Sequence, residues 1–82
     1  MLKSVPVPIA EIYVPTKHLK TIEPEKVETI AESIIEEGQR TPIQVRLGKG
    51  RYVLLTGVHR LEAMKALGEE AIDALIVSAR KA

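Results

Sequence analysis

The clearest pattern in the chain is a stripe of apolar residues with helical spacing in its first half. Five apolar side chains recur at intervals of one, three or four residues: Val27, Ile30, Ala31, Ile34 and Ile35. This spacing places them on one face of a helix, and such a face typically packs against a core. Pro24 suits the first turn of this helix, and Gly38 suits the position after its last turn. The pattern predicts a core-facing helix that begins at Pro24 and ends before Gly38.

Short apolar segments predict the strands of a sheet. Residues 43–47 alternate between apolar and polar side chains, and residues 51–55 return after a glycine-rich turn over 48–50, so the two segments predict a hairpin. Residues 5–9 are apolar but carry two prolines, which fits an edge strand because proline cannot donate a backbone hydrogen bond. The other expected segments are an extended continuation over 12–14, a loop over 16–21, a closing strand over 71–77 and a frayed tail over 78–82.

A second helix is predicted between the hairpin and the closing strand. It covers about residues 59–67 and ends at Gly68, with its apolar side chains directed inward: Leu61, Ala63, Met64 and Leu67. The order strand, helix, hairpin, helix, strand is typical of the α+β class. We therefore expect one α+β domain over residues 1–82.

Composition narrows the classes of function. The 82 residues include 2 Tyr and no Phe or Trp, so the core must be aliphatic, and base stacking on aromatic side chains has almost no residues to use. The net charge of +1, with both signs interspersed, argues against a large basic face for duplex DNA. The absence of cysteine excludes a thiolate metal site and a cysteine nucleophile, and two histidines argue against structural zinc. No segment has the length of a membrane span or a signal peptide, so we expect a cytoplasmic protein without a membrane partner.

The junction between the hairpin and the second helix carries the most chemical information. An apolar strand ends at Gly57, and His59 and Arg60 follow at the start of the helix. A helix start presents unpaired backbone N–H groups and the positive end of the helix dipole, so it suits an anion such as a nucleotide phosphate. Gly57 would let the backbone approach the ligand, and Arg60 adds a planar set of donors. Alternatively, His59 caps its helix, and Arg60 pairs with a carboxylate such as Glu23 or Glu36.

One edge of the first helix offers a matching set of polar groups. Lys26, Thr29 and Ser33 fall at i, i+3 and i+7, so they share one side of the helix. A lysine and two hydroxyls can hold phosphate oxygens or a ribose. The alternative is a solvated face that happens to carry these residues.

Other charged residues leave several roles open. Glu36 or Glu37 could hold a metal ion with the phosphates or act as a general base, although acidic residues near a helix end are often only solvated. Glu62 is expected in the first turn of the second helix, where a carboxylate favours the helix dipole. A small basic loop could close over a polyphosphate or keep the segment soluble: Lys17, His18 and Lys20.

The turn Gly57-Val58-His59-Arg60 resembles the ParB/sulfiredoxin superfamily when it is read with three other segments. These are residues 9–14, 24–34 and 42–45, and the resemblance covers about residues 5–77. Sulfiredoxins carry Gly-Cys-His-Arg at this junction and bind ATP with magnesium, whereas ParB N-terminal domains carry Gly-Glu-Arg-Arg and bind CTP. The free-serine kinases related to ParB form a third branch. Here residues 61–63 and 66–68 are ParB-like, and His59-Arg60 is similar to sulfiredoxin.

The resemblance implies a small mixed β-sheet packed with two main helices, and it implies a nucleotide site. By similarity to sulfiredoxin, Lys26, Thr29 and Ser33 would contact the phosphate and sugar, while the turn from Gly57 to Arg60, Val58 included, would hold the phosphates. Val58 stands where sulfiredoxin has its cysteine, so sulfinic acid reduction through a thiol is excluded. The ParB glutamate and arginine are replaced by Val58 and His59, which puts CTP selectivity and hydrolysis in doubt.

The leading hypothesis is a nucleotide-binding domain that takes ATP or ADP with Mg²⁺, or less readily CTP. Slow hydrolysis or phosphoryl transfer is compatible with it, with Glu36 and His59 as the candidate catalytic residues. No protein cluster for a metal ion is expected. One rival is a non-enzymatic interaction module that pairs through its edge strand or uncovered apolar faces, and a homodimer stays open. The other is a DNA-associated fragment acting through exposed cations: Lys3, Lys17, Lys20, Lys49 and Arg51. Sequence-specific DNA binding is not expected, because no helix-turn-helix pattern occurs.

Overall fold

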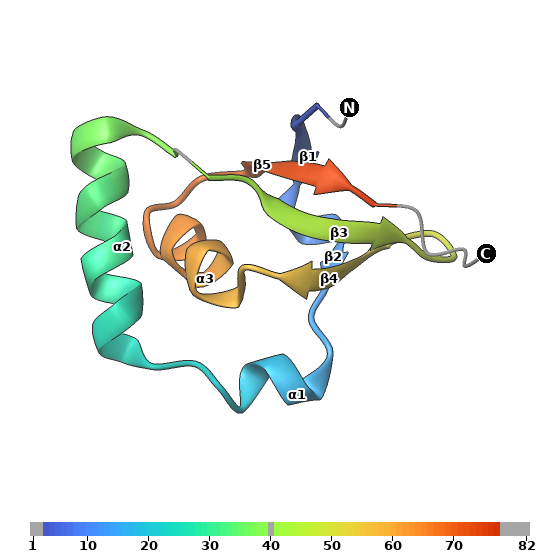
Figure 1. Cartoon of the computed structure of the whole chain (residues 1–82), viewed down its shortest axis with the longest axis horizontal. Helices are drawn as coiled ribbons and strands as arrows, with labels where there is room; N and C mark the ends of the chain where they lie inside the picture. Colours follow the sequence, from blue (N-terminus) through green and yellow to red (C-terminus); the bar gives the residue numbers. More distant parts are fainter. Residues whose placement is uncertain (1–2, 40, 78–82) are drawn as a thin grey trace.

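The computed structural model describes residues 3–39 and 41–77, which form a mixed sheet with the two longer helices to one side of it (Figure 1). The α+β class and the two main helices are confirmed. In chain order, the elements are β1 (Val5–Pro8), a 3₁₀ turn (Ile9–Glu11), β2 (Ile12–Tyr13), α1 (Thr16–Leu19), α2 (Pro24–Glu37), β3 (Ile43–Leu47), β4 (Tyr52–Thr56), α3 (Val58–Ala66) and β5 (Ala71–Ile76). Among the described residues, no helix is both long enough and apolar enough to cross a membrane.

The five strands lie in the order β1-β5-β3-β4-β2. The hairpin pair β3–β4 is antiparallel, as predicted, and β5 returns through α3 to lie parallel to β3. Segment β1 pairs with β5 alone, with Val5 opposite Ala74 and Val7 opposite Ile72, so the proline-bearing strand is an edge strand as predicted. The other edge is β2, which runs parallel to β4.

The core lies between the sheet and α3. Leu61, Ala63 and Met64 of α3 are buried, as the helical pattern predicted, while Leu67 is only half-buried. Their partners are aliphatic side chains from the sheet and its connections: Val7, Ile9, Ile43, Val45, Leu54, Ile72 and Ala74. The aliphatic core expected from the composition is therefore present.

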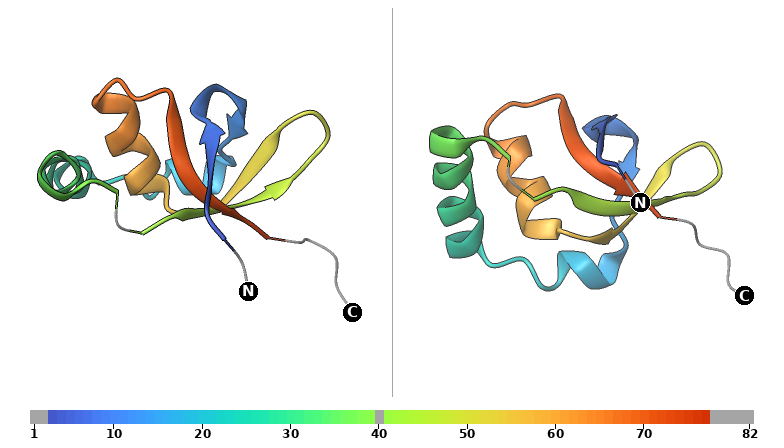
Figure 2. Two further views of the ribbon diagram at one scale, coloured as in Figure 1. Left: turned by 90° about the horizontal axis from the view of Figure 1, so that it is seen from above. Right: turned by 45° about the horizontal axis from the view of Figure 1, so that its top comes forward.

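Helix α2 lies on the far side of α3 from the sheet (Figure 2). It packs chiefly against α3 and buries none of its residues fully, although Val27, Ile30, Ala31 and Ile34 are half-buried. The prediction that Ile35 faces the core is wrong, since this side chain is 69% exposed. A single partner helix contacts only a narrow strip of α2, and Ile35 lies beyond that strip. Helix α2 is thus held by fewer contacts than α3.

Two local expectations are also corrected. Residues 16–21 were expected to be a loop, but Thr16–Leu19 forms one helical turn, in which the Lys20 N–H donates to the Thr16 carbonyl at 3.2 Å. Glu62 falls beyond the first turn of α3, because the helix begins at Val58; its carboxylate lies 3.5 Å from Lys65 Nζ. The predicted tail over 78–82 lies outside the described residues.

Gln39 anchors the end of α2 to the sheet. Its side-chain Nε2 donates to the carbonyl oxygens of Thr41 and Asp73, each at 3.0 Å, and its Oε1 accepts from the Asp73 N–H at 2.8 Å. The amide thus pairs with the backbone of β5 much as another strand would. This contact holds one end of α2 while its apolar strip packs on α3.

Candidate functional site

Gly57 makes the turn between β4 and α3. Its φ of +103° lies in the left-handed region that L-residues avoid, and the Gly57 carbonyl accepts the first helical hydrogen bond of α3, from Leu61 N–H at 2.9 Å. A Cβ at this position would come within 2.6 Å of Ile43 Cγ2 on β3. The expected reason for the glycine, close approach of a ligand, is therefore not what the geometry requires: the missing side chain points at the core. The glycine allows the helix to start against the sheet.

The start of α3 presents three backbone N–H groups, those of Val58, His59 and Arg60. Within residues 3–39 and 41–77, no protein acceptor is hydrogen-bonded to them, and Gly57 provides no side-chain cap. The Val58 side chain is buried in the core, so this residue offers a ligand only its amide. Free amides at the positive end of a helix are suited to an anion.

Arg60 is half-buried beside these amides. Among the residues that the structure describes, it forms no ion pair; the expected alternative partner Glu23 contacts Lys26 instead, at 3.6 Å. The Arg60 side chain lines two neighbouring hollows, one at the Gly57–Arg60 turn and one toward the end of α2. Its planar set of donors, which no carboxylate of the described residues occupies, suits an external anion.

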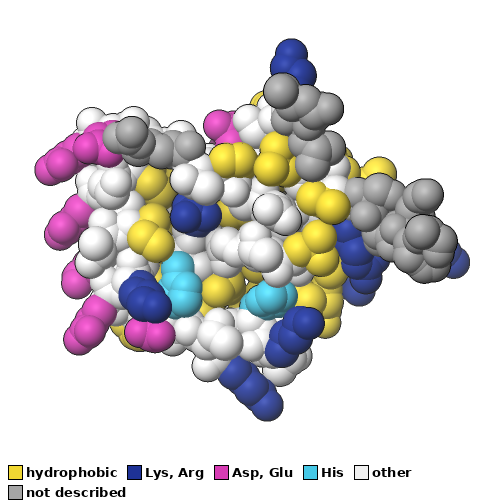
Figure 3. Space-filling view, in the orientation of Figure 1, with side chains coloured by type: hydrophobic (Ala, Val, Ile, Leu, Met, Phe, Trp, Pro, Cys, Tyr) yellow, Lys and Arg dark blue, Asp and Glu magenta, His cyan; other side chains and the backbone are white. Residues whose placement is uncertain are grey.

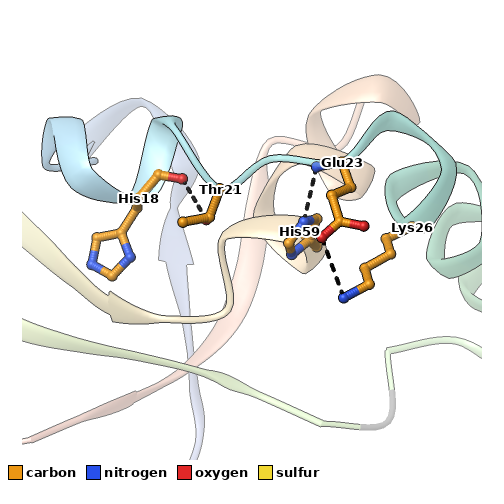
Figure 4. A network of polar contacts seen from close by, with 5 residues as sticks. All are labelled: His18, Thr21, Glu23, Lys26 and His59. Carbon is orange, nitrogen blue, oxygen red and sulfur yellow. Dashed lines mark hydrogen bonds and ion pairs between the residues drawn. The ribbon is translucent and has the colours of Figure 1, made fainter.

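His59 joins the two helices at their starts. Its Nε2 accepts a hydrogen bond of 3.0 Å from the backbone N–H of Glu23, the residue that precedes α2 (Figure 4). The histidine was considered as a cap for its own helix; it caps the other one. The contact spans 36 positions of sequence, so no local pattern could reveal it.

The predicted polar edge of α2 faces the same region. Three adjoining hollows all include Ile30: one of about 350 Å³ at the Gly57–Arg60 turn, one of about 230 Å³ that includes Ser33 and Arg60, and one of about 370 Å³ that includes Lys26 and Thr29. We call them together the Ile30 cradle. Figure 3 shows basic and histidine side chains around apolar ones on this face, with acidic side chains along the outer edge at α2. The residues chosen from the two motifs thus line one region.

Two side chains of the polar edge, Lys26 and Thr29, already form contacts within the protein. Lys26 pairs with Glu23, but both side chains are 61% exposed, and such a pair is worth at most about 1 kcal/mol, so the lysine can turn to a ligand. The Thr29 hydroxyl donates to the Glu25 carbonyl one turn earlier at 3.0 Å, which leaves its oxygen as an acceptor. Ser33 is exposed.

Residues outside the two motifs also line the cradle. Thr21 and His18 border the turn hollow, where the Thr21 hydroxyl donates to the His18 carbonyl at 2.8 Å. Ile30 forms the shared floor, and Gln39 borders the hollow that includes Ser33. The basic loop indicated His18 as a possible ligand contact. Ile30 was part of the apolar stripe, and that pattern predicts only packing against the core.

The two candidate catalytic residues, Glu36 and His59, are not brought together in the structure. Glu36 is exposed and lines none of these hollows, and His59 uses Nε2 in its contact with Glu23. The part of the chain that the structure describes contains no group of three or more His, Cys, Asp or Glu residues that could hold a metal ion.

A larger hollow, of about 630 Å³, is a groove on the other side of α2, between α2 and α3. Its apolar lining comprises Ile22, Pro24, Val27, Ala31 and Ala66, and its charged lining comprises Glu25, Glu28, Glu62 and Lys65. We call it the α2–α3 groove. With three carboxylates and one lysine, it does not suit an anion, so size alone does not identify the ligand site here.

Comparison with known proteins identifies the family of this chain. The sequence model described as the ParB N-terminal domain matches residues 2–82. The chain belongs to the ParB N-terminal domain family. The expected ParB/sulfiredoxin relationship is therefore confirmed, and the fold shared with sulfiredoxin agrees with it.

Proteins similar to this ParB N-terminal domain include a nucleoid occlusion protein, a sulfiredoxin and a ParB. A nucleoid occlusion protein of Halalkalibacterium halodurans is 37% identical over 70 residues, which are 84% of this chain but 25% of that protein. The chain thus spans about a quarter of its curated relative. Sulfiredoxin from Arabidopsis thaliana superposes with a TM-score of 0.84 at 30% identity, covering 94% of this chain and 86% of the other. C-terminally truncated ParB from Caulobacter crescentus, complexed with CTP-γ-S, gives 0.82 at 24% identity, covering 96% and 46%; at that identity the likeness shows the fold.

Proposed function

We propose that this ParB N-terminal domain binds a nucleotide in the Ile30 cradle. The phosphates lie at the start of α3, where the amides of Val58, His59 and Arg60 and the Arg60 guanidinium converge. The sugar and base extend along α2, past Lys26, Thr29 and Ser33. The observation that carries the proposal is that, within the described residues, amides without a protein acceptor and an arginine without an ion pair meet in one hollow. That is the arrangement by which helix starts bind phosphate groups.

Proteins of the same fold support a nucleotide as the anion. The Caulobacter crescentus ParB structure contains CTP-γ-S, and structures of a free serine kinase with this fold contain AMP or ADP. The three hollows of the cradle adjoin one another and measure about 230 to 370 Å³ each. Their combined volume suits a small-molecule ligand.

Within this proposal, ATP and ADP are favoured over CTP. The basis is the turn itself, in which His59 and Arg60 are similar to the turn of the ATP-binding sulfiredoxins rather than to that of ParB. Mg²⁺ would be held mainly by the phosphate oxygens and water, as is usual for this ion with nucleotides.

Binding is proposed as the primary activity. Slow hydrolysis or phosphoryl transfer requires mainly positioning and charge neutralisation, which the cradle can provide. The candidate base His59 is engaged with Glu23, and Glu36 lies outside the hollows, so neither is placed for proton abstraction from a nucleophile here. Because the chain contains no cysteine, thiol-based sulfinic acid reduction is excluded.

Titration with ATP, ADP and CTP in the presence of Mg²⁺ tests the proposal. We expect dissociation constants on the order of 1 µM to 1 mM, the range corresponding to about 4 to 8 kcal/mol of binding free energy, with ATP or ADP bound more tightly than CTP. Isothermal titration calorimetry measures this directly, and adenosine serves as a control that lacks the phosphates. No heat of binding with any of the three nucleotides would contradict the proposal. Tighter binding of CTP would contradict only the adenine preference.

A second candidate function, self-association, is favoured by the α2–α3 groove. The groove combines an apolar lining with carboxylates, and α2 carries five glutamates and one lysine although the whole chain has a net charge of +1. Outside α2 the chain therefore has more cations than carboxylates, and these cations on a second copy are complementary to the carboxylates of this groove. The proposed occupant is that second copy.

Light scattering over a range of concentrations tests this candidate. We expect the mean mass to rise with protein concentration and to fall when salt is added, because salt screens the charge attraction. Ala31→Glu should keep the protein monomeric by placing another carboxylate in the groove, while the exposed control Glu32→Gln should not. A monomer mass at every concentration would remove self-association through this groove.

A further inference from the structure

The backbone N–H of Glu23, the residue before α2, lacks the local acceptor that helices commonly provide. The N–H of the residue before a helix is often bonded by a Glu or Gln three positions later. Here the preceding residue is Glu23 and the third position is Lys26, whose ammonium group cannot accept a hydrogen bond. His59 Nε2 fills this role from the start of α3, at 3.0 Å (Figure 4).

This contact defines the tautomer of His59. An imidazole that accepts through Nε2 carries its proton on Nδ1. The side chain therefore bridges the two helices, while the backbone N–H of the same residue remains one of the free amides at the start of α3. His59 thus belongs to the Gly57–Arg60 turn, which we call the phosphate turn, and also holds the start of α2, whose polar edge forms the opposite wall of the cradle.

Helix α2 depends on such contacts more than α3 does. It has no fully buried residue, and it packs on α3 through half-buried side chains. At its end it is anchored by Gln39 to Asp73, and at its start by Glu23 to His59. Loss of the His59 contact frees the end of α2 that carries Lys26 and Thr29.

We infer that the His59 imidazole is a positioning residue, which sets the distance between the phosphate turn and the polar edge of α2. The inference rests on the proposed nucleotide function and adds a division of roles to it. The amides and Arg60 bind the phosphates, and His59 holds the wall that contacts the sugar and base. Glu23 and Lys26, the charged groups around this contact, pair with each other across the surface.

Two variants separate positioning from direct phosphate binding. His59→Leu removes the acceptor, whereas His59→Gln can restore it, because glutamine places a carbonyl oxygen near the position of Nε2. Two probes are used: inorganic tripolyphosphate, which needs only the phosphate turn, and ATP with Mg²⁺, which needs both walls. We expect His59→Leu to weaken ATP binding about tenfold, corresponding to about 1.4 kcal/mol, and tripolyphosphate binding less than about threefold. His59→Gln should bind ATP nearly as well as the original protein.

Hydrogen exchange of the Glu23 amide, measured by NMR without ligand, provides an independent readout. We expect it to exchange faster in His59→Leu than in the original protein and at nearly the original rate in His59→Gln. Equal weakening of both probes, or no recovery in His59→Gln, would overturn the inference. So would an unchanged Glu23 exchange rate in His59→Leu. If the original protein binds neither probe, the proposed function fails, and the exchange data still decide whether His59 holds α2.

Discussion

Arg60→Ala should weaken nucleotide binding by about 10- to 100-fold and leave the fold intact. A hydrogen bond to a charged group contributes about 1.5 to 3 kcal/mol, and each 1.4 kcal/mol is tenfold in the dissociation constant. Arg60 is half-buried and forms no ion pair within the described residues, so its removal leaves no carboxylate without a partner inside the protein. The energetic loss should therefore appear in binding and not in folding.

Arg46→Ala is the matched control for Arg60→Ala. Arg46 is also half-buried, but it lies on β3 and lines none of the hollows of the Ile30 cradle. Calorimetry with ATP and Mg²⁺ should show unchanged affinity for this control, and circular dichroism should show the same thermal unfolding for both variants. Normal ATP binding by Arg60→Ala would refute the anion site. Unfolding of Arg60→Ala would show that the arginine supports the fold.

Gly57→Ala should lower the free energy of unfolding by about 2 to 5 kcal/mol. A left-handed conformation costs an L-residue about 1 to 2 kcal/mol, and forcing extra volume into a packed core costs about 1 to 3 kcal/mol more. The added Cβ would lie 2.6 Å from Ile43 Cγ2 and 2.9 Å from Ile43 Cβ, and Ile43 is fully buried in the sheet. Small domains have only about 5 to 15 kcal/mol of stability, so this loss is large.

Gly50→Ala separates the two contributions to the Gly57→Ala effect. Gly50 also has a positive φ, +68°, but an added Cβ there would meet no atom within 4 Å. Urea unfolding should therefore show a loss of only about 1 to 2 kcal/mol for Gly50→Ala. Equal losses for the two variants would show that the contact with Ile43 has no cost.

Local pattern accounts for most elements of this fold. The start of α2 at Pro24, its end before Gly38 and the hairpin around residues 48–50 all follow from residues whose backbone preferences act within a few positions. The apolar spacing of α3 identified its buried face for the same reason. Ile35 was misplaced because spacing alone does not say how wide a strip the partner element covers.

The candidate site was predicted as two motifs, and the contact between them could not be predicted. Each motif was visible because its residues are close in sequence: the Gly57–Arg60 turn, and the edge formed by Lys26, Thr29 and Ser33. Their meeting around Ile30 depends on how α2 packs against α3, and that packing involves residues about thirty positions apart.

The sequence by itself determined most of the elements, the glycine turn between β4 and α3, and the chemical types on both walls. Short-range backbone preference and side-chain period are sufficient for these properties. Only the tertiary structure decided that Gly57 must lack a side chain because Ile43 packs against it. It also decided that His59 caps α2 and that Arg60 has no ion pair within the described residues. Each of these depends on a contact between distant segments, and such contacts exist only after the sheet and the two helices have packed together.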